Sequence, residues 1–373
     1  MNVKSIDIAR ALGISKSTVS LALNGKPGVS EQTRQEVLAC KKQLEEHGAV
    51  PPGMFSRQTE QRKRQQIKIV KITNGMKNIQ GAELDLWTDV NQVFEKNLQV
   101  NGYSLGLLYA DFREEDQSRM IAECNADDVA GVIIFGTELK QENSPLLDGI
   151  RKPLVIYDAA PDIEKYPVIL IDNRQGVELA VNELLAKGNT DIQYLCNPLP
   201  MYNYLSRRRG FQEIMKQKGL GDASDRIINT GSSIEEVHQM MREYLKTAKL
   251  PQAYIMESYH VSMGTIMAMH DLNIRIPEDV SLIGIDALPS FLTGGIDMTS
   301  IRVPHTERAY WAIQLLLKEI EHPVKEKCKL YTNCVFVDGE TVKKRYKRTA
   351  SDKVQIPCGK LNFFLTLQEI AFL

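Results

Sequence analysis

The sequence predicts an α/β protein: three short N-terminal helices, a linker, and two lobes that each hold a doubly wound parallel sheet. Apolar residues recur at helical spacing in three short segments of residues 5–46. Residues 47–66 contain proline, glycine and many basic or polar residues, as a connector between domains does. From residue 67 onward, apolar runs alternate with amphipathic segments, the pattern of parallel strands covered by helices on both faces. So many strands over about 280 residues favour two sheets over one.

Composition excludes several classes of protein. The chain has 373 residues, of which 43% are hydrophobic and 25% charged, as in globular proteins of two or three domains. No run of 18 apolar residues is present, and the N-terminus lacks the apolar stretch of a secretory signal. The six cysteines form no CxxC pair and no metal-ligand spacing. We therefore expect a cytoplasmic protein with free thiols, no membrane contact, no metal and no cofactor.

The net charge of −1 conceals an uneven distribution of charge. Residues 1–68 carry twelve lysines and arginines against six acidic residues, which gives about +6 and leaves about −7 for the remainder. A basic head on an acidic body indicates a polyanionic partner for the head.

The head reads as three capped helices. Ser5, Ser15 and Ser30 each precede a helical segment, at 6–13, 16–24 and 31–46, and the first segment stops at a glycine. The side chains at helical spacing that we expect in the core of the head are Ile6, Ala9, Leu12, Val19, Ala22, Leu23, Val37, Leu38 and Leu44.

Two short helices joined by a tight glycine turn and followed by a third form a helix-turn-helix, whose second helix enters the major groove of DNA. With its apolar residues turned into the domain, the second helix presents another set toward base edges: Lys16, Ser17, Ser20 and Leu21. Ser15 and Thr18 lie at its N-terminus, where hydroxyls and free N–H groups suit a phosphate.

The stretch "IDIARALGISKSTVSLALNGKPGVSEQTRQEVL" resembles the headpiece of the lactose-repressor (LacI/GalR-type) family of bacterial transcription regulators. The resemblance implies that Lys16, Ser17 and Leu21 read bases. It also implies phosphate contacts from Ser15, Thr18, Ser20, Asn24, Ser30, Thr33 and Arg34. Leu21 is a departure from family members that have arginine at this position. A leucine can contact a thymine methyl but cannot form a bidentate contact to guanine, so we expect a different operator sequence.

The linker fits this family poorly. Its members have a hinge helix in this region that inserts a leucine into the minor groove. Here the leucine position falls on Gln58, and Met54 and Phe55 are the nearest apolar side chains. Arg57 is expected to contact phosphate. A hinge and a flexible basic tether without intercalation both remain open.

Polar residues follow several predicted strands of the body. They are Asp158, Asp172, Asn173, Glu257, Ser258 and Asp286, with Arg207 directly before a helix predicted at 208–219. Ligands of doubly wound sheets bind beyond the carboxyl ends of the strands. We therefore expect these side chains to surround one cleft.

The body resembles the effector domain of the same family, which is built like periplasmic binding proteins. The segments that carry the resemblance are "VILIDNRQGVELAVNELLAKGN", "LSRRRGF", "IPEDVSLIGID" and "MTSIRVP". It implies that Asp158, Arg207 and Asp286 grip hydroxyls or a charged group of an effector, a sugar or another small metabolite. Ser258 and Tyr259 replace the family's Asn-Asp pair, and no tryptophan lies near Gly231 to stack on a sugar ring.

These observations divide the chain as follows: a helix-turn-helix headpiece at 1–46, a linker at 47–66, an effector and dimerisation domain at 67–348, and a tail at 349–373. Lobe 1 is expected at about 67–170 and 303–330, and lobe 2 at about 171–302 and 331–348.

The function expected is a sequence-specific transcription regulator of the repressor type. It would bind double-stranded, palindromic operator DNA as a homodimer, under allosteric control by a small molecule. The alternative is a solute-binding module without regulatory DNA binding. An enzyme is disfavoured, because no G-x-G-x-x-G after the first strand, P-loop or G-x-S-x-G motif is present.

Overall fold

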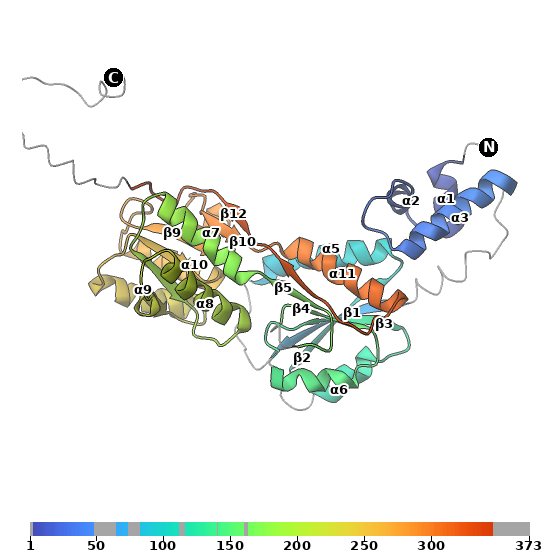
Figure 1. Cartoon of the computed structure of the whole chain (residues 1–373), viewed down its shortest axis with the longest axis horizontal. Helices are drawn as coiled ribbons and strands as arrows, with labels where there is room; N and C mark the ends of the chain where they lie inside the picture. The colour runs from blue at the N-terminus through green and yellow to red at the C-terminus, as the bar shows by residue number, and fades with distance from the viewer. Residues whose placement is uncertain are drawn as a thin grey trace, which may run out of the picture.

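A computed structural model describes residues 3–47, 65–73, 83–111, 116–139, 141–159 and 163–345. These residues form a headpiece (3–47) followed by two α/β lobes, which we call lobe 1 and lobe 2 and which lie side by side (Figure 1). Most of the predicted linker, including Arg57, and the predicted tail lie outside the described residues.

The headpiece consists of α1 (Ser5–Leu12), α2 (Lys16–Leu23) and α3 (Glu31–His47). The caps predicted at Ser15 and Ser30 are confirmed, since their hydroxyls accept the N–H groups of Thr18 at 3.0 Å and Thr33 at 3.1 Å. The cap predicted at Ser5 is wrong. Ser5 is the first residue of α1, and the Asp7 carboxylate instead accepts the backbone N–H of Lys4.

The core of the headpiece corrects two further expectations. Ile6 and Leu38, which we expected inside, are largely exposed, and Ile8 is completely buried. Ile8 lies one residue before Ala9 and four before Leu12, so the buried face of α1 is rotated from the face that includes Ile6. The other expected core residues are buried or partly buried.

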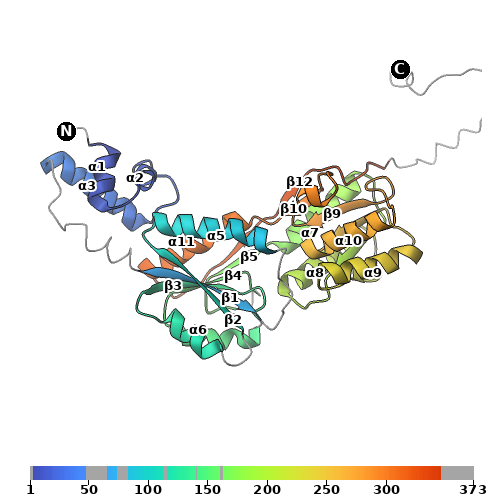
Figure 2. The ribbon, with the colours of Figure 1, turned by 180° about the vertical axis from the view of Figure 1, so that it is seen from behind.

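Lobe 1 is a parallel six-stranded sheet in the order β11-β5-β4-β3-β1-β2. Its apolar strands are buried on both faces, by α5 and α11 on one and by α6 and η1 on the other (Figure 2). Its elements are β1 (Gln66–Thr73), α5 (Glu83–Val100), β2 (Ser104–Asp111), α6 (Asp116–Cys124), β3 (Val129–Phe135), η1 (Gln141–Gly149), β4 (Leu154–Tyr157), β5 (Val168–Ile171), α11 (His305–Glu321) and β11 (Lys329–Thr332).

Lobe 2 is a six-stranded sheet in the order β12-β10-β9-β8-β6-β7, parallel except for β12. Helices α7 and α8 cover one face, and α9 and α10 cover the other. Its elements are α7 (Asn173–Ala186), β6 (Ile192–Cys196), α8 (Tyr202–Gln217), η2 (Ser224–Arg226), β7 (Ile227–Asn229), α9 (Ile234–Thr247), β8 (Ala253–Met256), α10 (Tyr259–Asp271), β9 (Ser281–Ile285), η3 (Ser290–Leu292), β10 (Ser300–Arg302) and β12 (Val335–Val337).

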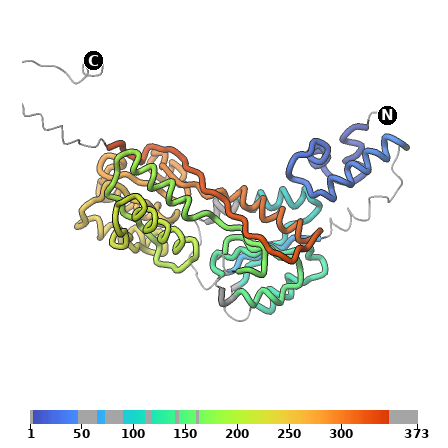
Figure 3. Tube along the Cα trace, in the orientation of Figure 1, coloured from blue at the N-terminus to red at the C-terminus, as the bar shows by residue number. Residues whose placement is uncertain are grey.

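The chain passes between the lobes after β5, after β10 and after β11, and Figure 3 shows these connections running along the junction. The junction brings together the loops that follow the strands of both sheets. It is therefore the place where side chains from distant parts of the sequence meet. None of the helices in the described part of the chain is long and apolar enough to cross a membrane.

Candidate nucleic-acid interface and effector cleft

The helix predicted to enter the major groove of DNA is α2. Lys16, Ser17 and Ser20 are exposed on it, while Leu21 is half-buried and packs against the headpiece core. The Ser15 hydroxyl lies 2.6 Å from that of Ser17 and 2.8 Å from that of Thr18. The hydroxyls of Ser15 and Thr18 are thus partly engaged in capping their own helix, while Ser15 and Ser17 remain exposed.

Other residues expected at phosphates also hold the headpiece together. Arg34 donates to the carbonyl oxygens of Ala22 at 2.8 Å and Lys26 at 3.0 Å, which ties the end of α2 to α3. The Asn24 amide donates to the carbonyl oxygen of Ser20 at 2.8 Å. Thr18, Thr33 and Ser30 are buried. Besides any contact to DNA, these side chains stabilise the turn of the motif.

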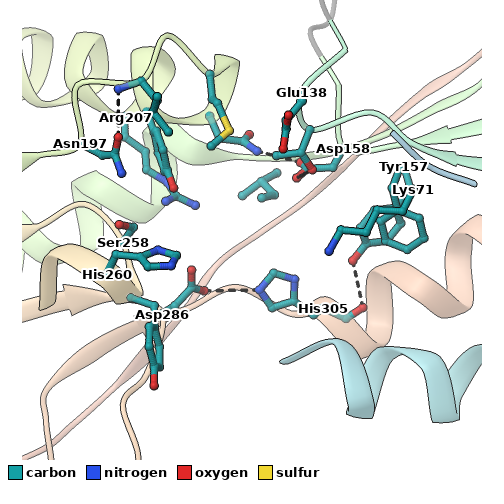
Figure 4. Close-up of a pocket in the computed structure, with 18 of the residues that line it drawn as sticks. Lys71, Glu138, Tyr157, Asp158, Asn197, Arg207, Ser258, His260, Asp286 and His305 are labelled. Atoms are coloured by element: carbon teal, nitrogen blue, oxygen red, sulfur yellow. Dashed lines mark hydrogen bonds and ion pairs between the residues drawn. The ribbon is translucent and has the colours of Figure 1, made fainter. Parts of the chain in front are cut away.

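A cavity of about 150 Å³ lies at the junction of the lobes. Asp158, Arg207, Ser258 and Asp286, the four side chains proposed for effector binding, all line it (Figure 4). They come from the ends of β4, β8 and β9 and from α8. The structure therefore brings residues up to 128 positions apart to one cleft, because parallel strands end at the same edge of each sheet.

Asp158 connects the two lobes. Its carboxylate accepts hydrogen bonds from Thr137 at 3.0 Å and Arg308 at 2.9 Å in lobe 1, and from Asn203 at 2.9 Å in lobe 2. Burial acts to raise the pKa of Asp158, but Arg308, Asn203 and Thr137 outweigh it, so the pKa lies below its ordinary value. Asp158 is thus an ionised acceptor at neutral pH.

Arg207 is held in place by lobe 2. Its Nε donates to the Asn173 side chain at 2.9 Å and its Nη1 to the Glu257 carbonyl oxygen at 2.7 Å. The Asn173 amide donates in turn to Asn203 at 2.7 Å. The position expected for Arg207, just before a helix, is wrong, because α8 begins at Tyr202 and encloses it. The residue before this first turn is Met201, whose side chain does not cap the helix, so no capping residue marked its start in the sequence.

A second contact between the lobes joins Asp286 to His305, with 3.4 Å between the carboxylate and Nε2. Burial acts to raise the pKa of Asp286, but His305, Arg207 and Arg308 outweigh it and lower the pKa. Asp158 and Asp286 both have left-handed backbones, with φ of 65° and 70°. Such conformations are costly for residues other than glycine and concentrate at functional sites.

Two other strand-end acids have structural roles. The Asp172 carboxylate caps α7 by accepting the N–H of Gln175 at 2.9 Å. Glu257 is completely buried and pairs with Arg208 at 2.9 Å. Neither lines the cavity.

Arg308 is the most informative residue that the sequence reading missed. It is completely buried, lies 4.3 Å above the Tyr157 ring, and lines the cavity. Among the described residues, its Nε and Nη1 have no hydrogen-bond partner. Buried donors without acceptors are costly, so a ligand that supplies oxygen atoms would relieve this cost. The sequence offered one signal for Arg308: it lies in the first turn of the helix that follows "SIRVP", a segment that resembles the effector domain.

Further polar side chains line the cavity without having been singled out in the sequence. They are Lys71, Thr137, Glu138, Asn197, Asn203, Ser232, His260 and His305. The lining therefore combines positively charged, negatively charged and neutral polar side chains with the aromatic side chains of Phe135, Tyr157 and Tyr204. This lining suits a small molecule that carries several hydroxyl or charged groups. Within the described ranges, no cluster of three or more His, Cys, Asp or Glu residues is arranged to hold a metal ion.

The fold and these two sites define a class: a helix-turn-helix headpiece carried by a two-lobed binding domain. A family model described as "Bacterial regulatory proteins, lacI family" matches residues 6–46, and one described as "Periplasmic binding protein-like domain" matches 181–342. The HTH-type transcriptional repressor PurR of Histophilus somni (strain 2336) is 25% identical over 321 residues, 86% of this chain and 93% of PurR. The ribose operon repressor of Escherichia coli (strain K12) is 25% identical over 335 residues, which cover 89% of this chain and 97% of the repressor.

Solved structures share the fold over most of the chain. The transcriptional regulator CelR–cellobiose complex superimposes with a TM-score of 0.63 at 20% identity, covering 91% of this chain and 100% of the other. The lac repressor dimer bound to operator and the anti-inducer ONPF gives 0.62 at 18% identity, with 92% and 100% covered. The chain thus joins a headpiece of the lacI type to a periplasmic-binding-protein-like domain, and these matches together with the repressor relatives support a DNA-binding, effector-responsive transcription regulator rather than an enzyme.

Proposed function

We propose that the protein binds a palindromic operator as a homodimer and that a small polar metabolite in the cleft between the lobes controls this binding. The observation that carries the proposal is the combination of an exposed face on α2 with a cleft in which two nitrogens of the buried Arg308, Nε and Nη1, have no acceptor among the described residues. The relatives that are named repressors, and a lac repressor structure described as a dimer on its operator, support the same assignment.

Base reading is assigned to Lys16, Ser17, Ser20 and Leu21, and phosphate binding to Ser15, Thr18, Asn24, Ser30, Thr33 and Arg34, with Arg57 of the linker. The test is selection of bound sites from a random DNA pool by the full chain at fixed salt. Wild type should recover a palindrome of about 14–20 base pairs, because two headpieces read two half-sites. The Lys16→Ala/Ser17→Ala variant should lose this selection.

Lys42→Ala is the matched control, because it removes another exposed lysine of the headpiece, one that lies on α3 and not on α2. Equal loss of selection in Lys42→Ala would show that only the total charge of the headpiece matters. Sequence-neutral binding by wild type would instead favour a solute-binding module with an incidental basic head.

Exposed apolar side chains support the homodimer. Leu107 and Tyr109 project from the edge strand β2, with Tyr109 63% exposed, and Phe291 of η3 is 76% exposed. Leu107 and Tyr109, two residues apart on β2, lie on the same face of the strand, and apolar side chains that lie together at a surface mark interaction sites. Sedimentation equilibrium of wild type and Tyr109→Glu tests this: we expect a dimer in the first case and a weakened dimer in the second.

The effector is assigned to Asp158, Arg207, Ser258 and Asp286, and a carbohydrate is the class we favour. The cleft offers carboxylate acceptors beside guanidinium donors, a set that suits vicinal hydroxyls, and the relatives include a ribose operon repressor and a regulator solved with cellobiose. The test is calorimetric titration of a panel of sugars and sugar acids. Asp286→Asn should lose binding, whereas Asp271→Asn, an exposed lobe 2 aspartate outside the cleft, should retain it.

A further inference from the structure

The headpiece rests on lobe 1 through the loop that precedes α3. The backbone N–H of Ser30 donates to the Asn101 side-chain oxygen at 3.2 Å, and this bond is buried. The backbone of Gly28 lies within hydrogen-bonding reach of the Tyr310 hydroxyl on α11. Val100 packs against the headpiece core. Figures 1 and 2 both show the headpiece beside α5 and α11.

The Asn101 side chain on the lobe 1 side of this contact is held in place by a hydrogen bond within lobe 1. Asn101 follows the last turn of α5, and its amide donates to the Asn97 carbonyl oxygen at 2.8 Å. This bond orients the side chain so that its oxygen points at Ser30. Only 4% of Asn101 is exposed. The acceptor for Ser30 is therefore built into a rigid helix end rather than a surface side chain that could turn away.

The headpiece turns its phosphate-binding edge toward lobe 1. Ser30 caps α3 and is only 8% exposed. Its N–H is one of the donors at a helix N-terminus that have no partner within the helix and can bind an anion. The start of α2 at Ser15 shares a hollow of about 590 Å³ with Glu95 and Gln99 of α5. Lys16 and Ser17, on the base-reading face, stay exposed. Lobe 1 thus approaches the edge that a DNA backbone would need, without covering the residues that would read bases.

We propose that lobe 1 holds the headpiece in a docked state that competes with operator DNA, with the Asn101 oxygen occupying the place of a phosphate oxygen at the Ser30 N–H. The inference rests on the proposed function in one respect, namely that the headpiece binds operator DNA. It adds a second route from effector to DNA, since Tyr310 lies two residues beyond Arg308 of the cleft on the same helix.

The test compares wild type with two full-length variants, Asn101→Ala and Tyr310→Phe. Each removes one lobe 1 group from the contact, and the half-buried Tyr310 makes the second variant mild for folding. Asn125→Ala is the matched control, because Asn125 also lies in lobe 1 and also makes two hydrogen bonds to backbone, at Gly149 and Arg151, away from the headpiece.

Two measurements are made on each protein. Hydrogen exchange of the peptide that contains residues 24–34, without DNA, reports docking, and the dissociation constant for the selected operator at fixed salt reports competition. We expect protection of this peptide in wild type and in Asn125→Ala, and faster exchange in the two contact variants. Operator binding should become about two- to tenfold tighter in Asn101→Ala, the effect of one buried hydrogen bond on a docked population.

Other results would overturn the proposal. An unprotected 24–34 peptide in wild type would show that docking does not occur in solution. Faster exchange with unchanged or weaker operator binding would show that docking does not compete with DNA. A wild-type chain with the protected peptide that selects no DNA site would refute the proposed function, and the competition with it, while leaving the contact itself established.

Discussion

Replacing Asp158 with alanine removes the one acceptor that the structure gives to the buried Arg308 guanidinium. The two side chains meet at 2.9 Å, and Arg308 is completely buried. Its Nε and Nη1 already lack partners in the described part of the chain. After the substitution, the Arg308 guanidinium would carry its charge in the interior beside the Tyr157 ring, without a hydrogen-bond acceptor among the described residues.

The magnitude follows from this environment. Removing one partner of a buried ion pair costs about 3–5 kcal/mol, because it leaves an uncompensated charge. Removing both charges costs much less, since an apolar side chain of similar length fills the space without a desolvation penalty. We therefore expect Asp158→Ala to lower the free energy of unfolding by about 3–5 kcal/mol. We also expect Asp158→Ala/Arg308→Met to be more stable than Asp158→Ala alone.

The assay is urea unfolding of the four proteins of this double-mutant cycle, followed by circular dichroism, with m-values compared to confirm that the same surface unfolds. A coupling free energy of about 2–3 kcal/mol is expected between the two positions. Additive effects, or a cost below about 1 kcal/mol for Asp158→Ala, would show that Arg308 is solvated or paired elsewhere. Asp148→Ala, at an exposed lobe 1 aspartate paired with Lys165, provides the control and should change stability little.

Two further predictions concern pH and the headpiece. The pKa values of Asp158 and Asp286 are lowered below their ordinary values in the folded protein. Their contribution to stability is therefore present above the pKa of the unfolded chain and is lost as the pH falls through the pKa of the folded protein. Acid titration of unfolding should therefore show a steeper loss below about pH 4 in wild type than in Asp158→Asn. Ser15→Ala removes the cap of α2 and should destabilise the headpiece by about 1 kcal/mol, measured by thermal unfolding; no change would mean that Ser17 or water replaces the cap.

The headpiece was largely predictable because its determinants are local. Capping serines, a glycine turn and helical spacing of apolar residues act within a few positions, so Ser15 and Ser30 fell where expected. Errors arose where a choice between neighbouring residues depends on packing across helices: Ile6 or Ile8 of α1 meets α3 according to a small rotation that spacing does not fix.

The cleft was predictable only in part, for a physical reason. Asp158 and Asp286 follow buried strands, and the topology of parallel sheets alone places strand ends together. Asn203, His305 and Arg308 lie in the first turns of helices, and their contribution depends on how the two lobes face each other across three chain crossings. No local pattern encodes that orientation.

The strengths of these contacts indicate how an effector signal is divided between two routes. The lobes are joined across the cleft by Asn203 to Asp158 and by His305 to Asp286. Arg308 donates to the same Asp158 oxygen as Asn203, so a ligand that supplies oxygen atoms to Arg308 acts on the acceptor of the first of these bonds. Hydrogen bonds to charged groups contribute about 1.5–3 kcal/mol each, enough for the 1–3 kcal/mol, or roughly 5- to 150-fold, typical of allosteric coupling. The docking contact at Ser30 supplies only about two- to tenfold. If the headpiece docks as we propose, its release from lobe 1 accounts for the weaker part of a full switch, and we expect the remainder to come from movement of the lobes that changes the spacing between paired headpieces.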